Sequence, residues 1–343
     1  TNDSEAKVTF THTFVNERVN ATIKLQKKDA ETNQAVPQGD ATLENAVYGL
    51  YARKDIVHPD GATGVIYKAG ERVATLTTDE NGEASVENLY LGEYFVKEIT
   101  PPVGYLADES EHDLVCSYEG DLTATVEREC VSLEQVKKQP FEIIKAANNG
   151  ETDADLLSGA GFTAYLLSDL TVKEDGSYDF DSAEPVVIGE NGATEMFTDE
   201  KGYACSIALP YGTYLVRETT TPHNYKPVDD FIVRITEHNP TTPQVWRVLL
   251  DEEFEAKLKI IKQDDETKKP VLHKGTEFRI YDLDKQEYVE QVTTYPTTTV
   301  HKTFFTDEEG YLILPQNLKI GHYRIEEVTA PYGYTLNENY VEI

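Results

Sequence analysis

Residues 198–202 read Thr-Asp-Glu-Lys-Gly, and residues 212–218 read Gly-Thr-Tyr-Leu-Val-Arg-Glu. Short runs rich in Val, Ile, Thr, Tyr and Phe between turns of this kind are typical of β-strands. Side chains at every second position of a strand share one face, so Glu218 points the same way as Tyr214 and Val216. The stretch therefore predicts a strand that carries a glutamate on an apolar face.

Both segments occur three times in the chain. The Thr-Asp-Glu-x-Gly turns are Thr78–Gly82, Thr198–Gly202 and Thr306–Gly310, and the strands that follow them end at Glu98, Glu218 and Glu327. Upstream of each turn an alternating strand ends at a lysine, namely Lys27, Lys145 and Lys262. The spacing of about 110–120 residues predicts three tandem modules at residues 21–136, 137–252 and 253–343, after a leader strand within residues 1–20.

The fold class predicted for each module is all-β. No stretch has the apolar spacing of an amphipathic helix, and several short strands with regular turns in a module of this size predict a β-sandwich or a small barrel. The segments between modules are short and poor in Gly and Ser, which predicts a stiff rod.

Composition excludes several classes of function. Acidic residues outnumber basic ones by 62 to 31, giving a formal charge of −31, so neither nucleic acid nor a membrane surface is an expected partner. No apolar run is long enough to span a bilayer, so targeting and anchoring signals are expected to be either absent from the protein or outside these residues. The eight His are scattered, and we expect no metal and no cofactor. Three cysteines do not make a disulfide scaffold; Cys116 and Cys130 are candidates for one bond.

The lysines share the pattern of the glutamates. Lys27 lies on one face with Ile23 and Leu25, and the same alternation places Lys145 and Lys262 with apolar residues. If these faces form the core, each module buries one Lys and one Glu. Burial lowers a lysine pKa and raises a glutamate pKa, which makes the amine a nucleophile and the acid a proton donor. The alternative is that these charges lie at strand ends and reach water.

The full run of motifs resembles the Cna B-type (SpaA-like) domains of Gram-positive pilins and surface adhesins. The matching residues include Lys262-Gln263-Asp264, Gly159-Ala160-Gly161-Phe162 and the run from Glu327 to Tyr334. The resemblance implies a Greek-key, prealbumin-like (Ig-like) β-sandwich in each of three tandem modules. It also implies a self-formed Lys–Asn or Lys–Asp isopeptide bond between the first and last strands, promoted by a glutamate.

In the second module the resemblance assigns the bond to Lys145 and Asp251, with Glu218 as the promoting residue. In the first module it assigns Lys27 and Glu98, but either Glu134 or Gln135 stands where Asn or Asp is expected. A bond in that module is therefore open, with an ion pair or a hydrogen-bonded core as the alternative.

In the third module Lys262 and Glu327 are present, and the last strand is missing. Residues Val8–Asn16 form an alternating pattern, and Asn16 precedes Lys27 by the same interval as Asp251 precedes Lys262. Asn16 is thus a candidate acceptor on the closing strand of a preceding module. The same strand is a candidate to complete the third module of a neighbouring molecule through an Asn16–Lys262 bond.

The function implied by this resemblance is a structural stalk or shaft of a bacterial cell-surface protein or pilin, stiffened by isopeptide bonds. Its expected location is the extracellular, cell-wall-anchored surface of a Gram-positive bacterium, where its partners would be other subunits of a surface fibre. The alternative is an adhesin whose module surfaces bind a host extracellular matrix protein or glycan. A turnover enzyme is not expected, because the only predicted reaction is a single intramolecular one.

Overall fold

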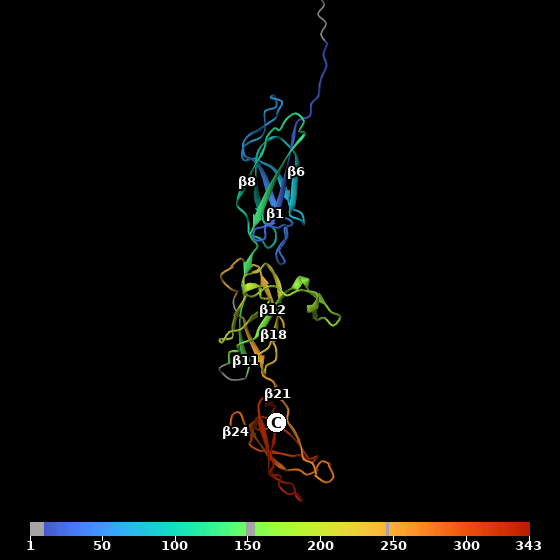
Figure 1. Ribbon diagram of the computed structural model, residues 1–343, viewed down its shortest axis with the longest axis vertical. Helices are drawn as coiled ribbons and strands as arrows, with labels where there is room; N and C mark the ends of the chain where they lie inside the picture. Colours follow the sequence, from blue (N-terminus) through green and yellow to red (C-terminus); the bar gives the residue numbers. More distant parts are fainter. Residues whose placement is uncertain (1–9, 149–154, 245–246) are drawn as a thin grey trace, which may run out of the picture.

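The computed structural model describes residues 10–148, 155–244 and 247–343, which form three β modules in succession along its long axis (Figure 1). The described residues contain strands and three short 3-10 turns. No helix among them is long and apolar enough to cross a membrane. The prediction of an all-β fold is confirmed.

The first module packs a three-stranded sheet, in the order β6-β1-β9, against a four-stranded sheet, in the order β5-β2-β7-β8. A small hairpin, β3-β4, lies in the connection between β2 and β5 of the four-stranded sheet. The strands are β1 (Asn20–Asp29), β2 (Val47–Ala52), β3 (Ile56–Val57), β4 (Val65–Tyr67), β5 (Arg72–Thr77), β6 (Glu83–Leu89), β7 (Gly92–Thr100), β8 (Glu111–Cys116) and β9 (Thr125–Glu134).

The second module repeats this plan with the sheets β16-β11-β20 and β15-β12-β18-β19. The hairpin β13-β14 belongs to an arm that projects sideways in Figure 1. The elements are β10 (Lys138–Gln139), β11 (Glu142–Asn148), β12 (Gly161–Leu166), η1 (Leu167–Asp169), β13 (Thr171–Val172), β14 (Tyr178–Asp179), η2 (Phe180–Ser182), η3 (Glu190–Gly192), β15 (Glu195–Phe197), β16 (Tyr203–Cys205), β17 (Leu209–Pro210), β18 (Gly212–Thr220), β19 (Phe231–Ile235) and β20 (Arg247–Glu252).

The third module has the sheet β24-β23-β30-β31, with β27 also paired to β23, and a sheet of only β22 and β28. Two further hairpin pairs are β25-β26 and β21-β29. The strands are β21 (Glu255–Ala256), β22 (Lys259–Ile261), β23 (Glu277–Asp282), β24 (Glu287–Tyr288), β25 (Gln291–Thr293), β26 (Thr299–His301), β27 (Phe304–Phe305), β28 (Tyr311–Ile313), β29 (Leu318–Lys319), β30 (Tyr323–Thr329) and β31 (Val341–Glu342).

The modules differ in whether their first strand has a parallel neighbour within the described part of the chain, and the burial of that strand differs with it. In the first two modules the first strand lies between an antiparallel and a parallel neighbour, and Ile23 and Ile143 are fully buried on it. In the third module β22 pairs with β28 alone among the described residues, and Ile260 on it is only half-buried. One edge of β22 therefore has no strand partner among the residues that the structure describes.

A tyrosine ties the same corner in all three modules. The hydroxyls of Tyr94, Tyr214 and Tyr323 each donate to the backbone carbonyl four residues upstream, at 2.6, 2.8 and 2.9 Å. This is the Gly-x-Tyr of the sequence motif, and it fixes the start of the strand that ends at the motif's glutamate. A buried hydroxyl needs such a partner, so the corner also sets how that strand enters the core.

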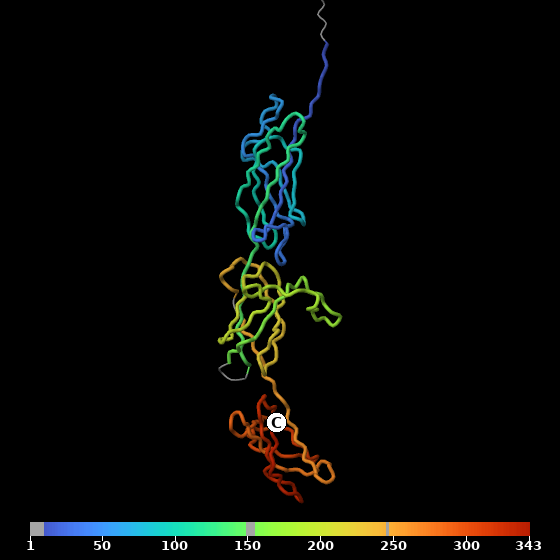
Figure 2. Tube along the Cα trace, viewed as in Figure 1, coloured from blue at the N-terminus to red at the C-terminus, as the bar shows by residue number. Residues whose placement is uncertain are grey.

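The chain crosses once between neighbouring modules (Figure 2). β9 ends at Glu134, and β10 already pairs with β17 of the second module. The first joint is reinforced by Asp40, whose carboxylate accepts hydrogen bonds from Thr213 N at 2.8 Å and from Ser168 Oγ at 2.7 Å. Tyr211 of the second module also packs against a small apolar cluster of the first.

The described residues before β1 pair with no strand of the described chain. Residues 10–19 carry no assigned secondary structure, and Figure 1 shows them leaving the first module as an extended trace. The remaining part of the predicted strand, residues 8 and 9, lies outside the described residues. Its assignment as the closing strand of another module stays a prediction.

Candidate functional site

The second module brings its three predicted site residues together. β11 and β20 are parallel with Lys145 opposite Leu249, so Asp251 stands two residues further along, on the same face. Lys145 Nζ is in ion-pair contact with Asp251 Oδ1 and lies 2.7 Å from Glu218 Oε2. Lys145 is 0% exposed and Asp251 1%. The alternation in the sequence therefore placed the lysine and the glutamate on core faces, and Asp251, which the resemblance assigned, lies beside them.

The glutamate is held from two sides. Its strand β18 pairs with β12, where Glu218 stands opposite Phe162. The backbone N–H of Val228 donates to Glu218 Oε2 at 2.9 Å. This fixed carboxyl touches the amine of Lys145, as a group that passes protons to and from the amine must.

The carboxyl of Asp251 is buried and has a raised pKa. Burial raises the pKa of Asp251 to about 6, against the opposing effect of Lys145. Its Oδ2 accepts no hydrogen bond from the residues that the structure describes. A carboxyl that protonates readily beside a buried amine has the chemistry of amide formation with loss of water, because a neutral acid is a better electrophile than a carboxylate.

In the first module Glu134, and not Gln135, occupies the acceptor position. β1 and β9 are parallel with Lys27 opposite Ser132, so Glu134 stands two residues further along, as Asp251 does. Lys27 Nζ contacts Glu134 Oε1. The side chain of Gln135 instead donates to Glu31 at 2.6 Å, at the surface. The sequence left Glu134 and Gln135 as alternatives for this position, and the structure places Glu134 there.

Glu98 completes this first cluster. Its Oε1 lies 3.4 Å from Lys27 Nζ, and its Oε2 accepts from Asp108 N at 2.8 Å. Burial, with a smaller effect from the hydrogen-bonded Glu134, raises the pKa of Glu98 to about 7. Lys27 and Glu134 are 0% and 2% exposed, so two carboxyls and one amine share a site without water access.

The third module forms only part of the site. Lys262 Nζ lies 2.7 Å from Glu327 Oε1, and Asn337 N donates to Glu327 Oε2 at 2.9 Å. The Lys262 side chain is 16% exposed, whereas its two counterparts are fully buried. No parallel strand offers an acceptor among the described residues. Asn16 is exposed in the segment before β1 and belongs to no cluster in this chain.

The repeated Thr-Asp-Glu-x-Gly turn positions the lysines, a role that the sequence did not reveal. In each module the glycine carbonyl accepts from the lysine N–H, at 2.8, 2.7 and 3.1 Å for Gly82, Gly202 and Gly310. Gly202 has a φ of +65°, and a Cβ there would come within 2.3 Å of the Lys145 carbonyl oxygen. The threonine hydroxyl also bridges two backbone groups, as Thr198 does between Ala160 N and Leu157 O.

The structure bears on two further kinds of site apart from the lysine clusters, a disulfide and a metal site. Cys116 and Cys130 are buried free thiols, so the structure contains no bond between them. Within the described residues no group of three or more His, Cys, Asp and Glu side chains is arranged to hold a metal ion. Both observations leave the lysine clusters as the chemistry to explain.

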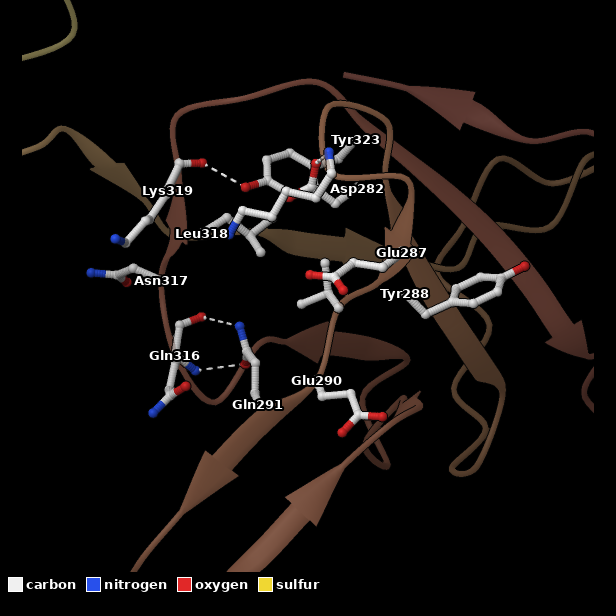
Figure 3. Close-up of a pocket in the computed structure, with 12 residues that line it drawn as sticks. Asp282, Glu287, Tyr288, Glu290, Gln291, Gln316, Asn317, Leu318, Lys319 and Tyr323 are labelled. Carbon is white, nitrogen blue, oxygen red and sulfur yellow. Dashed lines mark hydrogen bonds between the residues drawn. The ribbon is translucent and has the colours of Figure 1, made fainter. Parts of the chain in front are cut away.

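A surface cavity of about 630 Å³ lies in the third module (Figure 3). Gln291 and Gln316 on its wall satisfy each other, because Gln291 Nε2 donates to Gln316 O and Gln316 N donates to Gln291 Oε1. The lining contains neither Lys262 nor Glu327. The cavity is therefore separate from the lysine cluster of that module.

Three tandem sandwiches, each with a buried or half-buried Lys–Glu pair, define a class of modular β protein, and the comparisons identify it. The family model described as "SpaA: Prealbumin-like fold domain" matches residues 21–129, 140–247 and 256–343. The chain belongs to this family. The resemblance and the prealbumin-like fold predicted from the sequence are confirmed.

Solved structures with related architecture come from Gram-positive bacteria. The Bacillus anthracis TIE protein is 23% identical over 95% of this chain and 48% of its own, with a TM-score of 0.49. The chain thus spans about half of that protein. BcpA, the major pilin subunit of Bacillus cereus, is 17% identical over 94% of each of the two chains, with a TM-score of 0.35.

The shaft pilin SpaA from Lactobacillus rhamnosus GG is 16% identical over 69% of this chain and 98% of its own, with a TM-score of 0.25. No curated protein matches the chain. Because none of these TM-scores reaches 0.5, the family assignment rests on the family model.

Proposed function

We propose that this chain is a stalk or shaft segment of a Gram-positive cell-surface protein or pilus, in which an isopeptide bond between Lys145 and Asp251 locks the second module. The observation that carries the proposal is the contact of Lys145 with both Asp251 and Glu218 in a fully buried site between the first and last strands. The reaction is intramolecular and occurs once, so the protein is not a turnover enzyme.

The position of the bond suits a load-bearing role. β11 and β20 are parallel, so a pull on the two ends of the module shears these strands. An amide from Lys145 to Asp251 carries that force directly from one strand to the other. The roughly 100 residues between them then bear no load, and the module cannot extend.

The cost of burying the charges of the unbonded cluster also favours the bond. The effective penalty for burying an ion in a protein is on the order of several kcal/mol per ion even after relaxation, and pairing offsets only part of it. Amide formation removes the charges of Lys145 and Asp251 together. Glu218 is the group within reach of the amine to accept and return the proton.

The joint between the first two modules supports a stiff shaft. Lys138 forms an ion pair with Glu31, and Asp40 N donates to Tyr211 O at 2.9 Å, in addition to the contacts of the Asp40 carboxylate. Contacts on several sides of a short linker restrict bending more than the linker alone. On the bacterial surface the partners of such a segment would be neighbouring fibre subunits.

Force spectroscopy on the full chain tests the proposal. Unfolding of an unlocked second module would release roughly 350 Å of contour, at about 3.5 Å for each of roughly 100 residues. The third module, in which no acceptor strand lies beside Lys262 among the described residues, is expected to give a step in both chains. We expect K145M to show one more step of about 350 Å than the wild type. Equal numbers of such steps in the two chains would overturn the proposal. Specific binding of a module surface to a host matrix protein or glycan would favour the adhesin alternative.

A further inference from the structure

The acceptor site of the first module differs from that of the second at three neighbouring positions. Tyr48 stands opposite Glu98, where the second module has Phe162 opposite Glu218. Ser132 stands opposite Lys27, where the second module has Leu249 opposite Lys145. Tyr48 and Ser132 thus add two hydroxyls around one lysine, and Glu134 in place of Asp251 lengthens the acceptor side chain by one methylene.

The three polar side chains contact one another, and Tyr48 and Glu134 also contact the lysine. The Tyr48 hydroxyl donates to Glu134 Oε1 at 2.6 Å and accepts from Lys27 Nζ at 3.2 Å. Ser132 Oγ lies 3.3 Å from the same Glu134 oxygen, as a second donor to it. The other oxygen, Glu134 Oε2, is buried and accepts no hydrogen bond from the described residues. One oxygen of the carboxyl is thus held by hydroxyls, and the other is unpartnered.

We propose that Lys27 and Glu134 form an isopeptide bond, so that the first module is locked through the γ-carboxyl of a glutamate. Glu98 carries the proton, and the hydroxyls of Tyr48 and Ser132 hold the oxygen that becomes the amide carbonyl. The inference shares its chemistry with the proposed function, but the bond lies in another module and uses other residues.

The reaction balances without any added reagent. A proton passes from the ammonium of Lys27 to the Glu134 carboxylate, which leaves a neutral amine and a neutral acid. The lone pair of Nζ attacks Cδ of Glu134, and charge develops on Oε1, where Tyr48 and Ser132 donate. Glu98 takes a proton from Nζ and returns one to the unpartnered Oε2. The Cδ–Oε2 bond then breaks, and one water leaves as the amide forms.

The added hydroxyls explain how the site accommodates a longer acceptor. Glutamate has one more methylene than aspartate, so its carboxyl has more freedom, and reaction requires it to be fixed beside the amine. Tyr48 fixes it by bridging Lys27 and Glu134 directly. In the second module Phe162 offers no such donor, and the shorter Asp251 has less need of one.

A peptide map of the full wild-type chain tests the inference. We expect a cross-linked pair of peptides containing Lys27 and Glu134, lighter than their sum by one water. Y48F is expected to slow formation of this bond in freshly folded protein about 100-fold, as the loss of an oxyanion donor does elsewhere. Q135A is the matched control and is expected to form the bond at the wild-type rate.

The outcomes separate this inference from the proposed function. A wild-type digest with a free Lys27 amine and a linked Lys145 overturns the inference alone. A digest with the reverse pattern supports it and overturns the bond proposed for the second module. Loss of ammonia instead of water, abolished in Q135A, would make Gln135 the acceptor and would also refute the inference. The wild-type map does not depend on whether any variant folds.

Discussion

Replacement of Glu218 by glutamine separates proton transfer from packing in the second module. Glutamine keeps the size of the side chain and cannot accept and return a proton. Glu218 Oε2 is 2.7 Å from Lys145 Nζ, with no other carboxyl in that contact except the acceptor Asp251 among the described residues. We therefore expect E218Q to fold with Lys145 and Asp251 unlinked.

The size of the effect follows from the loop that the bond closes. Lys145 and Asp251 are separated by roughly 100 residues, for which the chain-entropy model of a cross-link gives about 4.7 kcal/mol. For a domain of this size each kcal/mol shifts Tm by about 4–8 °C. The transition of the second module should therefore fall by roughly 20–35 °C in E218Q.

Calorimetry of the full chain measures this shift, and the mass of each sample reports the bond. E237Q removes an exposed carboxylate of the same module and serves as the control, with no expected change in either reading. An E218Q protein that still loses one water would refute the role of Glu218. An unlinked E218Q protein that melts within about 3 °C of wild type would refute the argument from loop closure.

Three further predictions concern pH, the lysine turn and the joint. In K145M the buried Asp251 loses its partner cation, so its pKa, already raised to about 6 by burial, should rise further. A carboxyl whose pKa is higher in the folded than in the unfolded state stabilises the fold when it is protonated, so the second module of K145M should gain stability as the pH falls from 7 to 4. A Tm that falls over this range would contradict the assignment. Gly202 and Gly176 both have positive φ, but only at Gly202 would a Cβ strike the backbone. G202A should therefore destabilise the second module by well over the roughly 1–2 kcal/mol expected for G176A. Equal denaturant midpoints for the two variants would contradict this prediction. D40A removes two charge-assisted hydrogen bonds between the first two modules and should broaden the distance distribution between spin labels on them. An unchanged distribution would show that the Asp40 carboxylate does not hold the joint.

The sequence predicted the parts of the fold and site that depend on strand periodicity. Alternation placed Lys145 and Glu218 on core faces, and the family resemblance assigned Asp251 on the last strand. The two placements by alternation succeeded because a strand has only two faces, and a repeated pattern identifies the buried one.

The acceptor of the first module depended on register, which the sequence left open by one residue. Only the pairing of β1 with β9 shows that Glu134 faces Lys27 and that Gln135 faces outward. The signal was present in Tyr48 and Ser132, polar residues at positions where the second module is apolar, but it becomes readable only when the strands are aligned. The contacts of Asp40 could not be predicted, because they join residues of two modules that are far apart in the chain.

The most direct measurement of the central claim is the peptide map of the second module in the wild-type chain. A buried Lys145 in contact with both Asp251 and Glu218 predicts one cross-linked species that contains Lys145 and Asp251 and is lighter by one water. A linear peptide with a free Lys145 amine, recovered from folded protein, would contradict the account.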